Sequence, residues 1–165
     1  MYTFIYSFFC YSKCSKKRCY YTKDLQLLPG QWTGNLVYTD YKDDSTLIKL
    51  KLNLSITATT GENFSLKSEY TEPNGEIVKD SSSLFIDDSA SEVTYGGDIY
   101  SILKVRRTGS QLIIVTTMDG KDNNQDAEIR HTFNISARQF IILKEVRYLD
   151  KAEKFFTRHK LVVIK

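Results

Sequence analysis

The two histidines, His131 and His159, are the side chains with the widest chemistry here, because imidazole carries protons near neutral pH and can bind a metal or haem. His131 alternates with Ile129 and Phe133, and His159 shares its parity with Leu161, so each points with the apolar side of a strand pattern. Hydrogen-bonded core or rim histidines are the simplest interpretation of both. A metal site would require a third ligand, and no cluster of His, Cys and carboxylate residues supplies one, so no metal site is predicted.

Neighbouring carboxylates form no acid–base pair. They fall at predicted turns or strand ends, where aspartate accepts local backbone hydrogen bonds: Asp43 and Asp44, Asp87 and Asp88, and Asp119 with Asp122. Adjacent residues on a strand point to opposite faces, so such pairs do not share one cleft. The chain also has no nucleophile elbow, glycine-rich phosphate loop or Ser/His/Asp pattern. No catalytic residue is predicted, and binding is favoured over catalysis.

Basic residues and cysteines are concentrated in the first part of the chain. Residues 1–23 carry five Lys or Arg and no acid, whereas the rest has 18 basic and 20 acidic side chains. The body therefore has no electrostatic footprint for nucleic acid. All three cysteines, Cys10, Cys14 and Cys19, lie in this basic segment, so no disulfide supports the remainder of the chain.

The apolar run at 4–11 is too short to cross a bilayer as a helix, which takes roughly 20 residues. Basic residues follow the run, whereas a secretory signal has them before it. Residues 1–24 are thus interpreted as an atypical export signal, a membrane anchor or a disordered leader, and residues 25–165 as the folded domain. A cell-envelope, periplasmic or secreted location is expected, with a membrane tether through the tail as one option.

Alternation of apolar and polar residues places strands along the whole body. In residues 46–57 every second side chain is Ile or Leu, which is a strand period and not a helical one. The expected strands are 31–41, 46–57, 63–70, 76–87, 91–107, 111–118, 126–137, 139–149 and 154–164, with a bulge at Gly96-Gly97. Short links between consecutive strands predict an all-β antiparallel up-and-down meander barrel of about eight or nine strands.

Gly30-Gln31-Trp32 opens the first of these strands, and Gly34 follows it. Trp32 is expected to plug one end of the barrel, with Gly30 and Gly34 allowing close packing. This stretch resembles the G-x-W signature of the lipocalin and wider calycin superfamily, over roughly residues 25–165, and the chain is similar to compact bacterial members. The resemblance implies an arginine over Trp32, either Arg147 or Arg158. One calycin branch, the nitrobindins, holds haem through a histidine, so haem is an alternative to the expected absence of a cofactor.

A monomeric barrel that binds a small hydrophobic or amphipathic molecule is the expected function. The parity of the strands assigns these side chains to the ligand-binding interior: Leu36, Tyr38, Leu50, Leu52, Leu54, Phe64, Leu66, Tyr70, Ile129, His131 and Phe133. One alternative is a cell-envelope protein–protein interaction module with a filled barrel and an apolar outer patch, to which residues 140–149 would contribute. Another is an isomerase or cyclase that shapes a pocket around its substrate and uses His131 or His159.

Overall fold

The computed structural model describes residues 23–43, 45–60, 63–87, 89, 91–150 and 154–165. The predicted leader, apart from Lys23 and Asp24, lies outside these residues, as do Asp44 and Asp88. Within the described ranges, no helix has the length and apolar character needed to cross a membrane.

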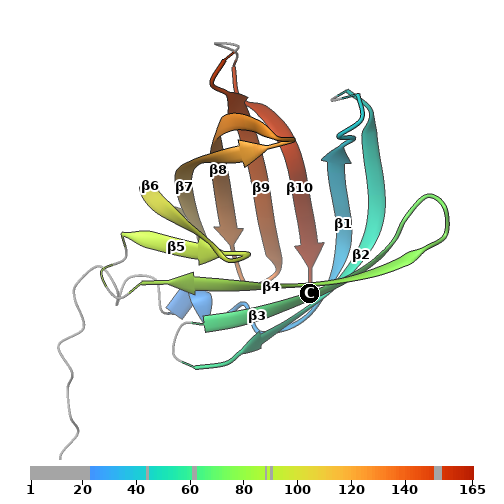
Figure 1. Cartoon of the computed structure of the whole chain (residues 1–165). Coiled ribbons are helices and arrows are strands. Elements are labelled where there is room, and N and C mark those ends of the chain that lie inside the picture. Colours follow the sequence, from blue (N-terminus) through green and yellow to red (C-terminus); the bar gives the residue numbers. More distant parts are fainter. Residues whose placement is uncertain (1–22, 44, 61–62, 88, 90, 151–153) are drawn as a thin grey trace, which may run out of the picture.

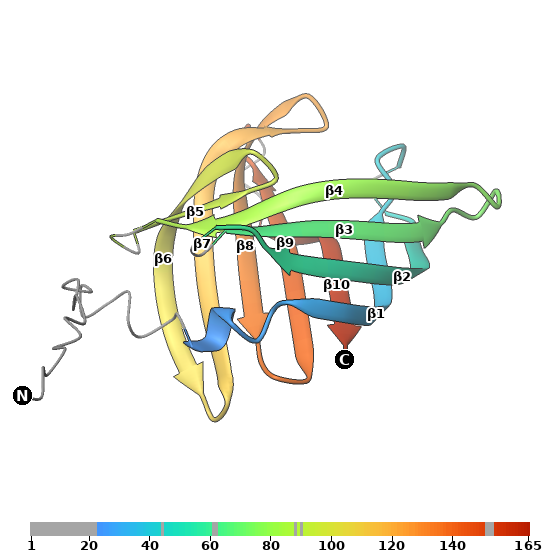
Figure 2. The same cartoon turned by 90° about the horizontal axis from the view of Figure 1, so that it is seen from below.

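The described residues form ten strands that close into one barrel. They are β1 (Gly30–Thr39), β2 (Leu47–Ala58), β3 (Asn63–Thr71), β4 (Ile77–Ile86), β5 (Glu92–Tyr95), β6 (Asp98–Thr108), β7 (Gln111–Asp122), β8 (Gln125–Ile135), β9 (Gln139–Tyr148) and β10 (Phe156–Ile164). Each strand pairs antiparallel with the next, and β10 returns to β1. Figures 1 and 2 show β2–β4 crossing the barrel at a steep angle to β8–β10. The predicted all-β meander is confirmed.

The predicted count of eight or nine strands is wrong, because the segment 91–107 is a hairpin and not one bulged strand. Gly96 and Gly97 have φ angles of 63° and 99°, and Tyr95 pairs with Asp98 across them. Positive φ at both central residues is the requirement of a tight two-residue hairpin turn, which glycine meets without strain. The glycine pair therefore reverses the chain and separates β5 from β6.

A glycine also closes the barrel where β1 meets β10. Gly34 pairs with Val163, and a Cβ at position 34 would stand 2.0 Å from the carbonyl oxygen of Val162. No side chain fits at that distance, so the two strands approach this closely only because residue 34 is glycine. Closure at this seam removes the sheet edges that β1 and β10 would otherwise expose.

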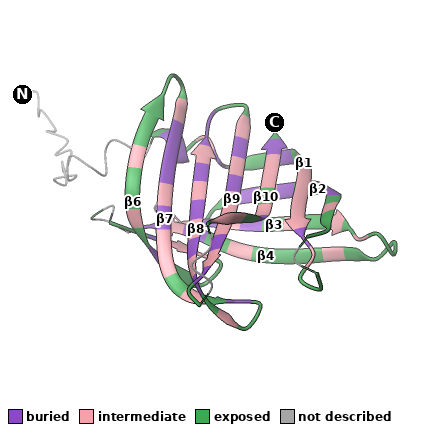
Figure 3. Cartoon of the chain, turned by 90° about the horizontal axis from the view of Figure 1, so that it is seen from above, coloured by how far each residue is buried: buried purple, intermediate pink, exposed green. Residues whose placement is uncertain are grey.

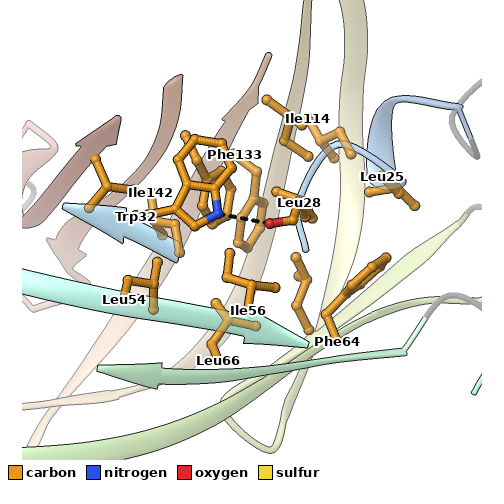
Figure 4. Packing of buried hydrophobic residues seen from close by; sticks show 14 of the residues in the cluster. Leu25, Leu28, Trp32, Leu54, Ile56, Phe64, Leu66, Ile114, Phe133 and Ile142 are labelled. Carbon is orange, nitrogen blue, oxygen red and sulfur yellow. Dashed lines mark hydrogen bonds between the residues drawn. The ribbon is translucent and has the colours of Figure 1, made fainter. Parts of the chain in front are cut away.

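One end of the barrel is filled by the segment that precedes β1. Residues 23–25 form a helical turn, and Leu25 and Leu28 pack into the core beside Trp32, which is 1% exposed (Figure 4). The indole Nε1–H of Trp32 donates to the carbonyl of Leu28 over 2.8 Å, so its polar atom is satisfied inside an apolar cluster. The Phe140 ring lies 6.2 Å from the indole.

The cation over Trp32 is a lysine, so neither arginine that the resemblance implied takes this place. Lys165 Nζ lies 4.5 Å from the indole centroid and donates to the carbonyls of Leu27 and Pro29. Arg147 has the outward parity of β9 and pairs with Glu128. Arg158 lies at the start of β10, whereas the end of that strand is beside Trp32.

Burial differs between the two sides of the barrel. Strands β8 and β9 largely alternate between buried and half-buried residues, whereas most of β6 and half of β4 are exposed (Figure 3). The main apolar cluster gathers around Trp32, and a smaller one contains Tyr100, Ile129 and Tyr148. Along β8, His131 stands between the residues of these two clusters.

Candidate functional site

Four interior side chains line up across four neighbouring strands. In register, His131 of β8 pairs with Lys144 of β9, Lys144 pairs with His159 of β10, and His159 pairs with Tyr38 of β1. Side chains at paired positions lie on one face of a sheet, about 5 Å apart at Cβ. The fold thus brings both histidines to one wall, with a lysine between them.

Three of these residues, His131, Lys144 and His159, line a cavity of about 330 Å³, which falls at the small end of the range for ligand pockets. Both apolar and polar side chains line it. The lining residues are Tyr95, Gly96, Asp98, Tyr100, Met118, Lys121, Ile129, His131, Lys144 and His159.

Most of the predicted interior residues lie elsewhere. Only Ile129 and His131 of the eleven line this cavity. Of the other nine, Leu36, Tyr38 and Tyr70 are half-buried, and the buried ones are Leu50, Leu52, Leu54, Phe64, Leu66 and Phe133. All the buried ones except Leu50 belong to the cluster around Trp32. Strand parity does not distinguish a side chain in the packed core from one in the cavity wall.

His131 is enclosed by aromatic rings and is 5% exposed. The rings of Tyr95 and Tyr100 meet the imidazole edge-to-face at centroid distances of 5.1 and 4.8 Å. Its Nδ1 atom is buried and has no hydrogen-bond partner among the described residues. Burial first, and then the charge of Lys144, lowers the pKa of His131 to about 3, so the imidazole is neutral at physiological pH.

His159 lies at an irregularity in β10. The register with β9 shifts between Thr157 and His159, which inserts Arg158 as an extra residue. The Nε2 atom of His159 is 3.1 Å from the hydroxyl of Tyr41, and its ring meets that of Tyr38 edge-to-face. Burial and the nearby Lys144 lower the pKa of His159 to about 4, so it too is neutral.

Buried charges surround the carboxylate of Asp122 beside the cavity. Lys144 Nζ donates to Oδ1 over 2.7 Å, and Arg158 Nε donates to Oδ2 over 2.9 Å. The Tyr148 hydroxyl accepts from Arg158 Nη2 over 2.7 Å and lies 3.4 Å from Oδ2. Arg158 is fully buried and Asp122 is 3% exposed, so this is an interior network and not a surface pair.

The sequence interpretation of Asp122 as a solvated turn residue is wrong. Strand β7 continues to Asp122, and the turn consists of Asn123 and Asn124, whose φ angles are 48° and 61°. An Asn-Asn pair suits a two-residue hairpin turn, because asparagine tolerates positive φ better than most residues. Had the Asn123-Asn124 pair been interpreted as the turn, the predicted strand would have extended to Asp122. Asp122 would then have had the same inward parity as Met118. Lys144 likewise shares the inward parity of Ile142 and Val146, but the sequence prediction did not include it among the interior residues.

Other features of the surface are weaker candidates for a functional site than this cavity. A hollow of about 440 Å³ on β1–β4 is lined mainly by polar side chains such as Asn53, Lys67 and Glu69, and the Glu69–Lys79 pair there is exposed. In residues 140–149, Leu149 is the exposed large apolar side chain, and Ile141 and Leu143 are half-buried. Within the described ranges, no group of three or more His, Cys, Asp or Glu could hold a metal ion.

Comparison with known proteins yields a fold and no family. No family model and no curated protein matches the chain. Among solved structures, Rv2717c from M. tuberculosis is similar, with a TM-score of 0.62 and 8% sequence identity over 87% of this chain and 95% of that chain. At this identity the similarity supports the closed antiparallel barrel and shows neither a family nor a ligand.

Proposed function

We propose that this protein is a calycin-like barrel that binds a small hydrophobic or amphipathic molecule in the 330 Å³ cavity. The observation that carries the proposal is His131, whose buried Nδ1 atom has no partner among the described residues while the side chain lines the cavity. An unsatisfied buried polar atom costs about 1–3 kcal/mol, and native proteins rarely leave one without a water, ion or ligand.

The lining supports a ligand with an apolar body. Tyr100, Met118 and Ile129 supply adjoining aromatic, thioether and aliphatic surfaces, and Tyr95 adds a second ring. Methionine adapts to irregular shapes, and buried aromatic rings contribute large contact areas. His131, Lys144 and His159 supply the few polar groups that orient a ligand in such pockets.

The arrangement does not fit haem. An axial ligand needs an imidazole nitrogen that faces an open slot, but His159 Nε2 is within hydrogen-bond distance of the Tyr41 hydroxyl. His131 is packed between the rings of Tyr95 and Tyr100, and its Nδ1 atom is buried. We therefore derive no chemistry through haem. An absorption spectrum of the purified full-length protein tests this conclusion, since a Soret band would contradict it.

Fluorescence titration of the full-length protein with N-phenyl-1-naphthylamine, a neutral apolar probe, tests the proposal. Enhanced emission with saturable binding is expected, and Met118→Trp, which fills the cavity, should weaken binding at least tenfold. Leu103→Trp is the control, because Leu103 is 53% exposed on β6 and is not among the lining residues. No saturable binding to the wild type, or equal loss in both variants, would overturn the proposal. Native mass spectrometry of protein purified without detergent would identify any ligand retained from the host.

A further inference from the structure

We propose that the ligand carries an anionic head group, and that Lys144 holds this group between His131 and His159. The inference rests on the proposed function, because it specifies the polar end of the molecule that the cavity takes. Lys144 is the middle residue of the paired row and lines the cavity together with both histidines.

The ammonium group of Lys144 has N–H donors that make no hydrogen bond to the described residues. Its side chain is 18% exposed, and Nζ donates one hydrogen bond, to Asp122 Oδ1 over 2.7 Å. An ammonium carries three N–H groups, and within the described residues no second acceptor lies within hydrogen-bond distance of Nζ. Two donors therefore remain for a group inside the cavity, where the low local dielectric strengthens a charged hydrogen bond.

Asp122 does not depend on Lys144 alone. Its other carboxylate oxygen accepts from Arg158 Nε over 2.9 Å and lies 3.4 Å from the Tyr148 hydroxyl. An incoming anion can therefore share Lys144 while Asp122 keeps the partners of Oδ2. Asp98 also lines the cavity but is exposed, and Lys121 lines it from an equally exposed position.

The neighbours of Lys144 suit an anion better than a cation. A cationic ligand would face the ammonium of Lys144 in a partly buried site, where like charges repel strongly. The two imidazoles are neutral, and a neutral imidazole carries one N–H donor. His131 also lines the cavity, and its Nδ1 atom has no hydrogen-bond partner among the described residues, so the imidazole still has a polar atom to pair in the bound state.

Two probes that differ by one charge test the proposal on the full-length protein. N-Phenyl-1-naphthylamine is neutral, and 8-anilinonaphthalene-1-sulfonate has the same ring system with a sulfonate. We expect the wild type to bind the sulfonate at least tenfold more tightly than the neutral probe, in line with hydrogen bonds to charged groups. Lys144→Met should abolish this preference, so that the ratio of the two affinities falls to near one, while Lys144→Arg should restore most of it.

Lys160→Met is the matched control, because Lys160 is exposed on the neighbouring strand and does not line the cavity. Lys121→Met tests whether the charge of the exposed lining residue Lys121, and not that of Lys144, causes the preference for the sulfonate. Equal binding of both probes by the wild type would overturn the inference and leave the proposed function standing, whereas failure of both probes to bind would overturn both. A preference lost in Lys121→Met or Lys160→Met but kept in Lys144→Met would overturn the assignment to Lys144.

Discussion

Lys165 Nζ stands 4.5 Å from the centroid of the Trp32 indole ring and donates to the carbonyls of Leu27 and Pro29. A residue that follows β10 thus holds the segment that precedes β1, next to the seam where these two strands close the barrel. The ammonium combines a cation–π contact with two charged hydrogen bonds to backbone carbonyls.

Lys165→Ala is expected to lower the free energy of unfolding by about 1 kcal/mol, because both kinds of contact are lost, though at an exposed position. Lys165→Arg should retain most of the stability, since a guanidinium also stacks on an indole and donates to carbonyls. Urea unfolding followed by Trp32 fluorescence measures the change. Lys160→Ala provides the control at an exposed position of β10. Equal effects of the two alanine substitutions would show that the contact with Trp32 contributes nothing.

Gly34→Ala is expected to destabilise the barrel by about 3 kcal/mol or more, because its Cβ would collide with the backbone of β10 and not with a movable side chain. Gly120→Ala is the matched control within β7. The atom nearest to a Cβ there is the terminal methyl of Met118, at 2.6 Å, which can rotate away. Its cost should stay within about 1 kcal/mol in urea unfolding. Similar costs at both positions would mean that β1 and β10 separate easily at Gly34.

Part of the fold could be predicted from the sequence alone. Alternation predicted the meander, and the glycines around Trp32 predicted close packing at the start of β1. The hairpin at Gly96-Gly97 was missed because a glycine pair inside a strand pattern is compatible with both a bulge and a turn. Only the pairing of Tyr95 with Asp98 distinguishes them.

The candidate site was harder to predict, because its residues meet only after the barrel closes. His131 and His159 were recognised from the sequence, but nothing in their local segments placed Lys144 between them. Arg158 and His159 both reach the interior because the register shifts there, which breaks the strict alternation that sequence parity assumes. Cavity volume depends on how side chains from distant strands fill the interior, and this property has no local signal.

Protein stability should fall between pH 7 and pH 5 because of the histidines. Both have folded-state pKa values well below the ordinary 6.5, about 3 for His131 and about 4 for His159. Over this range the unfolded chain takes up protons that the folded chain does not, so stability is lost as the pH falls. The expected loss is about 2 kcal/mol from His131 and less from the partly exposed His159. These are the only two histidines in the chain.

Urea unfolding at several pH values, for the wild type and His131→Phe, measures this dependence. Phenylalanine keeps an aromatic ring beside Tyr95 and Tyr100 but cannot be protonated. The variant should lose stability less than half as steeply as the wild type, whatever its stability at pH 7. Equal slopes would mean that His131 is protonated as easily in the folded protein as in the unfolded chain.

Asp122→Asn is expected to cost about 3–5 kcal/mol, because it removes the carboxylate that Lys144 and Arg158 share in the interior. Glu128→Gln is the matched control. Glu128 also lies between two cations, Arg130 and Arg147, but those arginines are on the outer face and half-exposed, so its loss should cost about 1 kcal/mol or less.

The double variant Asp122→Asn/Lys144→Met separates two explanations for a large cost. If the cost arises from buried positive charge left without its carboxylate, removing Lys144 as well should recover part of the lost stability, and the two substitutions will not be additive. If it arises from altered packing around Tyr148, the second substitution should add its own cost to the first. Urea unfolding of the two single variants and the double variant yields the coupling energy directly. A coupling energy near zero would mean that Lys144 and Asp122 act independently, even though 2.7 Å separates Nζ from Oδ1.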